Sequence, residues 1–383
     1  MGINAPNVSS NNISARNAGA ILEVDLGAIV ANWRSLCARH PTGAVAGVVK
    51  ADAYGLGAEF IVPALHAAGC RHFFVAHLHE ALAIRALAIR GLAPGCLLAV
   101  LNGLMPGAEA DYAAAGLTPV LGSVAEVAAW SAQARLIGRK LPAMLHVDTG
   151  MSRLGLDAAG LTALQDDPSL LDGIALTYVM THLVSSEVPD DPMNALQLTR
   201  FATACAVLPS APRSLANSSG IFLGAAWASD LARPGAALYG INPQPGQPNP
   251  MRPAVRLRAR VLSLRDIPAG TGVGYNATWT AARPSRIATV AMGYADGWHR
   301  SQSGHGLAIF DGRPVPLVGR VSMDLTTFDA TDHPAIVPGS WLEMIGPERS
   351  PDDVAAGTTN GYEILTSLGP RFYREYVFRE YIS

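Results

Sequence analysis

The stretch Val48-Val49-Lys50-Ala51-Asp52-Ala53-Tyr54-Gly55 closes an apolar run with a lysine and places a tyrosine four residues further on. The run 45–49 has the apolar composition of a buried strand. A lysine at the end of such a strand loses part of its hydration, which lowers the pKa of its amine and favours a Schiff-base nucleophile. The simpler alternative is a lysine whose stem lies along the strand while its ammonium group reaches water.

Seven further apolar runs follow the first one between residues 44 and 240. Strands are expected at 72–75, 97–101, 118–121, 144–147, 175–179, 214–216 and near Leu231. Segments typical of helices separate them, at 58–68, 78–90, 108–115, 124–136 and 195–208. Eight strand–helix alternations predict an α/β fold with a closed parallel (β/α)8 barrel of the TIM type. A doubly wound sheet is the alternative, because periodicity alone does not show that a sheet closes.

A mainly β C-terminal domain is expected after the barrel. At 383 residues the chain exceeds the limit of about 250 to 300 residues for one core. The segment 242–253 carries five prolines, a composition typical of linkers. The sequence therefore predicts a frayed tail over 1–19, a barrel domain over 20–245 and a β-rich domain over 246–383. Strands are expected at 255–264, 286–291, 316–321 and 341–345, and a helix at 362–368. The segment 21–24 is expected to pair with the second domain.

Composition favours a small-molecule function. The net charge is −2 and no basic run occurs, so nucleic acid and anionic membranes are unfavourable partners. No apolar run reaches the roughly 20 residues that span a bilayer. The four cysteines are scattered without metal-type spacing, which predicts no metal site and favours reduced thiols in the cytoplasm.

Polar residues directly follow the predicted barrel strands, where this architecture gathers its chemistry. They are Lys50, Arg153, His182, Asn217, Ser218 and Arg233. An arginine there could bind a phenolate or carboxylate, and a histidine ring could stack on an aromatic cofactor. Hydroxyls and glycine amides after the last two strands commonly bind phosphate. Taken singly, each has a simpler explanation: a loop arginine, a packed histidine or a helix cap.

Three loops of the second domain carry glycine-flanked aromatic or acidic residues. Tyr275 lies in Gly272-Val273-Gly274-Tyr275-Asn276, and Tyr294 lies in Met292-Gly293-Tyr294-Ala295-Asp296-Gly297. Met323 and Asp324 end the run Gly319-Arg320-Val321-Ser322-Met323-Asp324. Each alone is typical of a β-turn, but together they indicate loops that line a cleft.

The motifs at Lys50, Arg153, His182, Ser218, Arg233, Tyr275 and Asp324 resemble, in order and in domain placement, those of bacterial alanine racemases. These are fold-type III enzymes that use pyridoxal 5′-phosphate (PLP). The resemblance implies that Lys50 holds the cofactor covalently and that Tyr54, Ser218, Gly235 and Ala236 bind its phosphate. It implies that His182 packs on the pyridine ring, with Asn217 in the same cofactor site, and that Arg153 bonds the phenolate oxygen. Arg153, Tyr294, Met323 and Asp324 would contact the substrate.

The resemblance also implies a two-base racemisation of alanine. Lys50 would serve the D-enantiomer and Tyr275 the L-enantiomer. Arg233 would face the pyridine nitrogen without protonating it, since its pKa lies above about 12, and the weaker electron sink favours racemisation over decarboxylation. The family shares each site between two chains, so a homodimer is expected. The D-alanine would serve peptidoglycan synthesis, or the enzyme would act in alanine catabolism.

Two departures from the family pattern leave alternatives open. His146 stands where some relatives carry a carbamylated lysine, so another group must position Arg153. The segment 365–371 lacks a tyrosine that some members place near the phosphate, which leaves alanine, serine or a broader substrate range open. The rivals are a fold-type III decarboxylase, which usually pairs the pyridine nitrogen with a carboxylate, and a PLP-binding homeostasis protein, which lacks the second domain.

Overall fold

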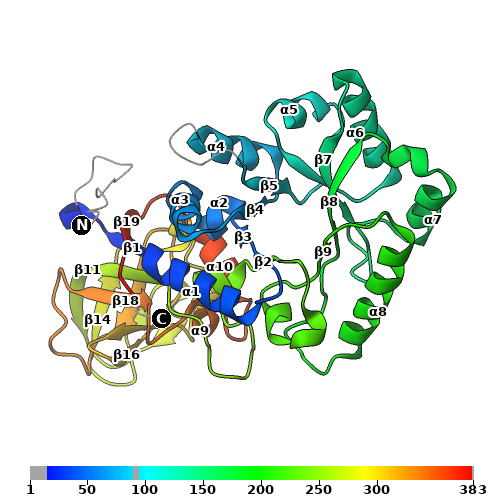
Figure 1. Ribbon diagram of the computed structural model, residues 1–383. Helices are drawn as coiled ribbons and strands as arrows, with labels where there is room; N and C mark the ends of the chain where they lie inside the picture. The colour runs from blue at the N-terminus through cyan, green and yellow to red at the C-terminus, as the bar shows by residue number, and fades with distance from the viewer. Residues whose placement is uncertain (1–14, 89–94, 382–383) are drawn as a thin grey trace.

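The computed structural model describes residues 15–88 and 95–381, and two sheets dominate it (Figure 1). Within these residues, nine parallel strand segments are arranged in the order β2-β10-β9-β8-β7-β6-β5-β4-β3. β2 (Ala44–Val45) pairs with β10 and β3 (Gly47–Val48) pairs with β4, so one interrupted strand joins the two edges of the sheet. The amide of Ala46, between the two halves, donates to the carbonyl of Ala232 at 2.9 Å. The predicted barrel is confirmed, and the doubly wound alternative is wrong.

The other barrel strands are β4 (His72–Val75), β5 (Leu97–Val100), β6 (Thr118–Leu121), β7 (Leu141–His146), β8 (Ile174–Met180), β9 (Arg213–Ser214) and β10 (Leu231–Ala232). The helices around them are α1 (Leu26–Arg39), α2 (Lys50–Gly55), α3 (Ala58–Ala68), α4 (Leu78–Ala88), α5 (Glu109–Ala114), α6 (Val124–Ile137), α7 (Ala158–Asp166) and α8 (Pro192–Val207). Residues 89 and 90 of the predicted helix 78–90 lie outside the described residues. No helix of the described parts combines the length and the apolar character that a bilayer crossing requires.

Side chains fill the interior of the barrel, so it is a packed core and its chemistry is confined to the ends. One buried cluster comes from neighbouring strands around the barrel and contains Ala46, Val48, Phe74, Ala99, Val120, Met144, Met180 and Leu231. Large and small apolar side chains together fill this cluster, as is usual in a barrel of this size. The rigid frame fixes the position of every loop that leaves a strand.

The C-terminal domain is a mainly antiparallel sheet beside α1 and α2 (Figure 1). Its strands are β11 (Val255–Ile267), β14 (Ser285–Val290), β15 (Leu307–Phe310), β16 (Arg313–Pro316), β17 (Thr326–Asp329), β18 (Trp341–Ile345) and β19 (Tyr373–Val377). A separate pair is formed by β12 (Gly272–Val273) and β13 (Trp279–Thr280), and two short helices are α9 (Pro351–Ala355) and α10 (Gly361–Ser367). β1 (Ala20–Asp25) joins the large sheet, antiparallel to β11 and parallel to β19.

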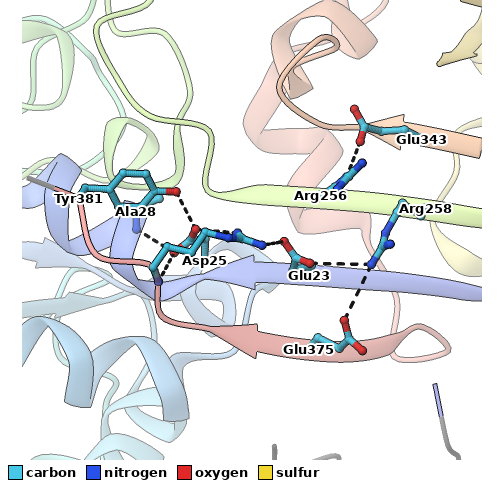
Figure 2. A network of polar contacts seen from close by, with 9 residues as sticks. Glu23, Asp25, Ala28, Arg256, Arg258, Glu343, Glu375 and Tyr381 are labelled. Atoms are coloured by element: carbon cyan, nitrogen blue, oxygen red, sulfur yellow. Dashed lines mark hydrogen bonds and ion pairs between the residues drawn. The ribbon is translucent and has the colours of Figure 1, made fainter. Parts of the chain in front are cut away.

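A polar network fastens β1 between the two halves of the chain (Figure 2). The buried Asp25 carboxylate caps α1 by accepting the amide of Ala28 at 3.0 Å. It also accepts from Arg379 Nη1 and from the hydroxyl of Tyr381, both at 2.8 Å. Arg379 Nη2 reaches Glu23 at 2.7 Å. The last described residues of the chain therefore lock the strand that leads into the barrel.

Some expected elements differ from the structure. The segment 316–321 is not a strand, because only Pro316 belongs to β16 and the chain then turns through Gly319 at φ 70°. The predicted frayed tail is too long: Ala15–Asn17 form a 3-10 turn and Ala18 is buried. Residues 1–14 lie outside the described residues. α7 and β19 were not expected, since neither has a strong apolar period.

Candidate active site

Lys50 is one of only two lysines among the 28 basic residues of the chain. Lys140 is exposed, whereas Lys50 is partly buried at the carboxyl end of β3. Burial lowers the pKa of the Lys50 amine, Arg153 lowers it further, and the Glu80 carboxylate opposes both. An amine with a lowered pKa is more often neutral, and neutral amines attack carbonyl groups. Of the two lysine side chains, only Lys50 has the surroundings of an imine-forming group.

The turn after Lys50 is left-handed over four consecutive non-glycine residues. Ala51, Asp52, Ala53 and Tyr54 have φ values of 54°, 53°, 53° and 58°. This region costs L-residues roughly 1–2 kcal/mol each, so neighbouring contacts must hold it. The amide of Gly57 donates to the carbonyl of Asp52 at 2.9 Å, and the Asp52 carboxylate accepts the amide of Ala58 at 2.7 Å. The turn brings Tyr54 back toward the barrel.

Tyr54, Ser218 and Gly235 form a cradle at the carboxyl ends of the strands. A Cβ atom on Gly235 would lie 2.3 Å from Oη of Tyr54, so only glycine leaves room there. The Oγ of Ser218 lies 3.1 Å from the amide of Gly235, directly before the 3-10 turn Ala236–Tyr239. Burial raises the pKa of Tyr54, so its hydroxyl stays a neutral donor. Hydroxyl and amide donors without a fixed negative charge suit a phosphate group.

Asn217 and Tyr239 support this cradle from behind. The side-chain oxygen of Asn217 accepts from Ser186 Oγ and from the amide of Gly220, both at 2.8 Å. These two hydrogen bonds hold the loop that carries Ser218. The ring of Tyr239 lies 4.8 Å from that of Tyr54, and its hydroxyl donates to the carbonyl of Val48.

Two neutral histidines lie around a buried arginine beside Lys50. Arg233 is buried and donates from Nη1 to Ser214 Oγ and from Nη2 to the carbonyl of Thr181, each at 2.5 Å. Burial lowers the pKa of Arg233 to about 10, so it remains a cation at neutral pH. Burial and Arg233 lower the pKa of His182 to about 3 and that of His146 to about 4. Both imidazoles are therefore uncharged.

The loop that carries Arg153 is fixed by its own backbone. The carboxylate of Asp148 accepts the amides of Gly150, Met151 and Ser152 at 2.9 to 3.1 Å. Burial opposes ionisation of Asp148, but these three bonds outweigh it and lower its pKa. Arg153 follows at the exposed tip of the loop. The loop that carries Arg153 is therefore held by Asp148, although His146 stands where some relatives carry a carbamylated lysine.

Two further residues of the site were not expected from sequence. Gln197 of α8 is fully buried and donates to Thr149 Oγ1 and to the carbonyl of His182, both at 2.9 Å. Glu80 of α4 accepts the amide of Ala51 next to Lys50 at 2.6 Å. A glutamine on the inner face of a predicted helix and a glutamate in the first turn of another were the available signals.

The predicted residues of the second domain lie on exposed loops. Tyr275, Tyr294 and Met323 are 65%, 43% and 54% exposed. The Tyr294 and Met323 loops are joined, since the amide of Ala295 donates to the carbonyl of Met323 at 2.9 Å. Asp324 pairs with Arg371, which also binds Asp296. Within residues 15–88 and 95–381, the Tyr275 side chain makes no hydrogen bond or ring contact.

A metal is not indicated by the same residues. Among the parts of the chain that the structure describes, no group of three or more histidine, cysteine, aspartate or glutamate side chains is arranged to hold one.

A closed barrel with a partly buried lysine beside an anion cradle defines a class of barrel proteins that can hold a phosphorylated aldehyde as an imine. Family models agree with that class. Residues 24–243 match the model for the alanine racemase N-terminal domain, and residues 254–376 match that for the C-terminal domain. The chain belongs to the alanine racemase family, which confirms the resemblance seen in the motifs.

Individual relatives cover nearly the whole chain. The alanine racemase of Acidiphilium cryptum is 57% identical over 354 residues, which is 92% of this chain and 97% of that protein. A catabolic alanine racemase of Mesorhizobium japonicum is 50% identical over 369 residues, 95% of each chain. The solved structure of alanine racemase from Bartonella henselae, with covalently bound pyridoxal phosphate, is 42% identical with a TM-score of 0.90. It covers 94% of this chain and 100% of its own.

Proposed function

We propose that this protein is a PLP-dependent racemase that interconverts L-alanine and D-alanine, with Lys50 and Tyr275 as its two bases. The observation that carries the proposal is the position of Lys50, the one partly buried lysine of the chain, at the barrel end that also holds the phosphate cradle. The names of the relatives supply the substrate and the cofactor.

The residues of the barrel fit this cofactor. Lys50 would bind its aldehyde carbon, while Tyr54, Ser218 and the amides of Gly235 and Ala236 would bind its phosphate. When bound, the cofactor supplies the electron sink that allows an amino acid to lose its Cα proton. His182 is uncharged and can pack a flat face on an aromatic ring. Asn217 would hold the Ser218 loop.

Arg233 favours racemisation over the other reactions of the class. It is charged, and its Nη atoms donate to Ser214 and to the carbonyl of Thr181. Decarboxylases of this fold type usually place a carboxylate at the ring nitrogen instead. An arginine does not release its proton, so a ring nitrogen beside it stays unprotonated. This argues against a decarboxylase of the same fold type.

Racemisation requires proton exchange on both faces of Cα. Lys50 would act on one face after its release from the cofactor, and Tyr275 on the other. Because Tyr275 is exposed and has no hydrogen bond or ring contact with the described residues of its own chain, we infer a head-to-tail homodimer in which each chain supplies Tyr275 to the other. Tyr294, Met323 and Asp324 would then line the substrate site together with Arg153 of the barrel.

The division of the chain and its location follow the same proposal. We place the cofactor-binding barrel at 20–245, with β1 packed on the second domain, and the β-rich domain at 246–383. Cys37, Cys70, Cys96 and Cys205 are all free thiols, which suits a cytoplasmic enzyme.

The test is to incubate the purified protein with L-alanine and PLP in deuterated water. The expected result is D-alanine formation with deuterium at Cα and the visible absorbance of a lysine-bound cofactor. Absorbance without turnover of alanine, with turnover of serine instead, would change the substrate. Release of carbon dioxide would favour the decarboxylase, and binding without any turnover would favour the homeostasis proteins.

A further inference from the structure

Glu80 joins three backbone amides around the turn that follows Lys50. It lies in the first turn of α4, and its Oε1 accepts the amide of Ala51 at 2.6 Å. Its Oε2 accepts the amides of Ala76 and His77 at 2.7 and 3.0 Å. One carboxylate therefore ties the end of β4 and the start of α4 to the residue directly after Lys50.

The same backbone arrangement recurs elsewhere in the barrel, without a lysine. Glu126 lies in the first turn of α6, and its Oε1 accepts the amide of Leu104 at 2.8 Å. Its Oε2 accepts the amide of Gly122 at 2.8 Å. Each glutamate thus ties the start of its own helix to the loop that follows the neighbouring strand, β3 for Glu80 and β5 for Glu126. This shared part is structural, and what distinguishes Glu80 is the amine next to its first acceptor bond.

The charges around Lys50 are otherwise positive. Arg153 acts on the amine, and Lys50 in turn acts on His182, while Arg233 is buried nearby. Glu80 shares a cavity of about 400 Å³ with three other titratable residues, Asp52 of α2, Glu59 of α3 and His79 of α4. His77, whose amide Glu80 accepts, lies directly before α4. Asp52 already accepts the amide of Ala58. Glu80 is the carboxylate that acts on Lys50 through space.

We propose that Glu80 is a positioning residue that fixes the strained turn after Lys50. Its negative charge also offsets the positive charges around the Lys50 amine. Its effect reaches the reaction only through Lys50, so it rests on the proposed function of that lysine. None of the ion pairs among the described residues joins the two side chains, so Glu80 acts through the amide of Ala51 and through its charge.

The presence of only two lysines allows a direct test in the cofactor-free protein. Chain labelled with ¹³C-lysine gives one signal from Lys50 and one from the exposed Lys140, which serves as an internal reference. We expect Glu80→Gln to lower the titration midpoint of Lys50 by about one pH unit, because a carboxylate that favours the ammonium form is lost. Glu126→Gln, the matched control, removes an equivalent backbone acceptor and should leave both lysine midpoints unchanged.

Glu80→Asp separates charge from reach. It keeps the negative charge, so the Lys50 midpoint should stay closer to the wild-type value even where the shorter side chain loses the amide of Ala51. In the holoenzyme, the acid limb of kcat/KM against pH should move in the same direction as the lysine midpoint. The proposal would be overturned if the Lys50 midpoint in Glu80→Gln equals that of the wild type while the Lys140 reference is also unchanged. An equal shift of the Lys50 midpoint in Glu126→Gln would overturn it too. Because the lysine signals need neither cofactor nor substrate, the test does not depend on whether alanine is racemised.

Discussion

Gly235 and Tyr54 face each other so closely that a Cβ atom on Gly235 would lie 2.3 Å from the tyrosine hydroxyl. Gly235 has a negative φ of −121°, so its backbone does not require glycine. Space alone excludes a side chain there, which means that the position of Tyr54 and the amide of Gly235 are set together. That amide also lies 3.1 Å from Ser218 Oγ. The three groups are thus one unit, and a change in one should be felt by an anion bound to the others.

Gly235→Ala should therefore weaken cofactor binding more than it weakens the fold. The new methyl group should displace the Tyr54 hydroxyl. Under the proposed function this removes one phosphate donor, a loss of about 1.5–3 kcal/mol for a bond to a charged group. We expect the Kd for PLP, measured by absorbance titration, to rise by one to two orders of magnitude. Gly160→Ala in α7 is the control, since the nearest neighbour of its new methyl group is the end of the Leu156 side chain at 3.0 Å. An unchanged PLP affinity in Gly235→Ala would remove Tyr54 from the phosphate site.

The sharing of each site between two chains can be tested with two inactive variants. In the proposed function, Lys50→Ala lacks the amine that binds the cofactor. Tyr275→Phe lacks the second base, which should lower kcat by about 10²–10⁴-fold while cofactor absorbance is retained. If Tyr275 acts on its partner, a mixed dimer contains one intact site, with Lys50 from one chain and Tyr275 from the other. Random mixing of equal amounts should then restore about a quarter of the wild-type activity.

The control for this experiment is a Lys50→Ala, Tyr275→Phe double variant mixed with Lys50→Ala chains. No combination of those chains carries an intact lysine, so no activity should return. Failure of the first mixture to recover activity, with exchange of subunits shown by mass spectrometry, would contradict sharing of the site.

The sequence could predict much of this arrangement because barrel topology converts order along the chain into position. Lys50, Arg153, His182, Ser218 and Arg233 each follow a strand, and closure of the sheet brings those strand ends to one face. Glu80 could not be found in this way. Its carboxylate binds the loop that follows β3, and nothing in the sequence around Glu80 shows which backbone amide it will reach.

Other features depend on contacts that no local pattern encodes. The left-handed turn at Ala51 to Tyr54 contains three residues with no special preference for positive φ, so propensity predicts the wrong hand. The expected strand 316–321 failed because its apolar residues are buried as a loop beside β17, with Val318 bonded to Thr327. Tyr275 was recognisable from its glycine-flanked motif, but its partner lies outside its own chain in our proposal.

Acid should destabilise the cofactor-free protein through His182. The pKa of His182 is about 3 in the folded chain because burial and Arg233 lower it, whereas an unfolded histidine titrates near about 6.5. The unfolded state therefore binds a proton that the folded state refuses, so stability is complete above about pH 6.5 and is lost as the pH falls toward 3. At pH 5 this one group costs about 2 kcal/mol.

His182→Asn removes that group and should flatten the decline. The measurement is the free energy of unfolding in urea at pH 7 and at pH 5, without cofactor. His305→Asn, at an exposed position of the second domain, should keep the wild-type difference between the two pH values. If His182→Asn retains the full loss at pH 5, His182 is not the group that resists protonation.

The left-handed turn predicts that one substitution has opposite effects at two alanines. At Ala51, φ is 54°, where an L-residue costs roughly 1–2 kcal/mol and glycine costs nothing sterically. Ala51→Gly keeps the amide that binds Glu80, and its gain exceeds the added chain entropy of about 0.5–1 kcal/mol. We expect the free energy of unfolding to rise by up to about 1 kcal/mol. Ala132→Gly, inside the right-handed helix α6, should lower it by about 1 kcal/mol. Equal losses in both variants, measured by urea unfolding of the cofactor-free chain, would mean that the turn after Lys50 is not left-handed in solution.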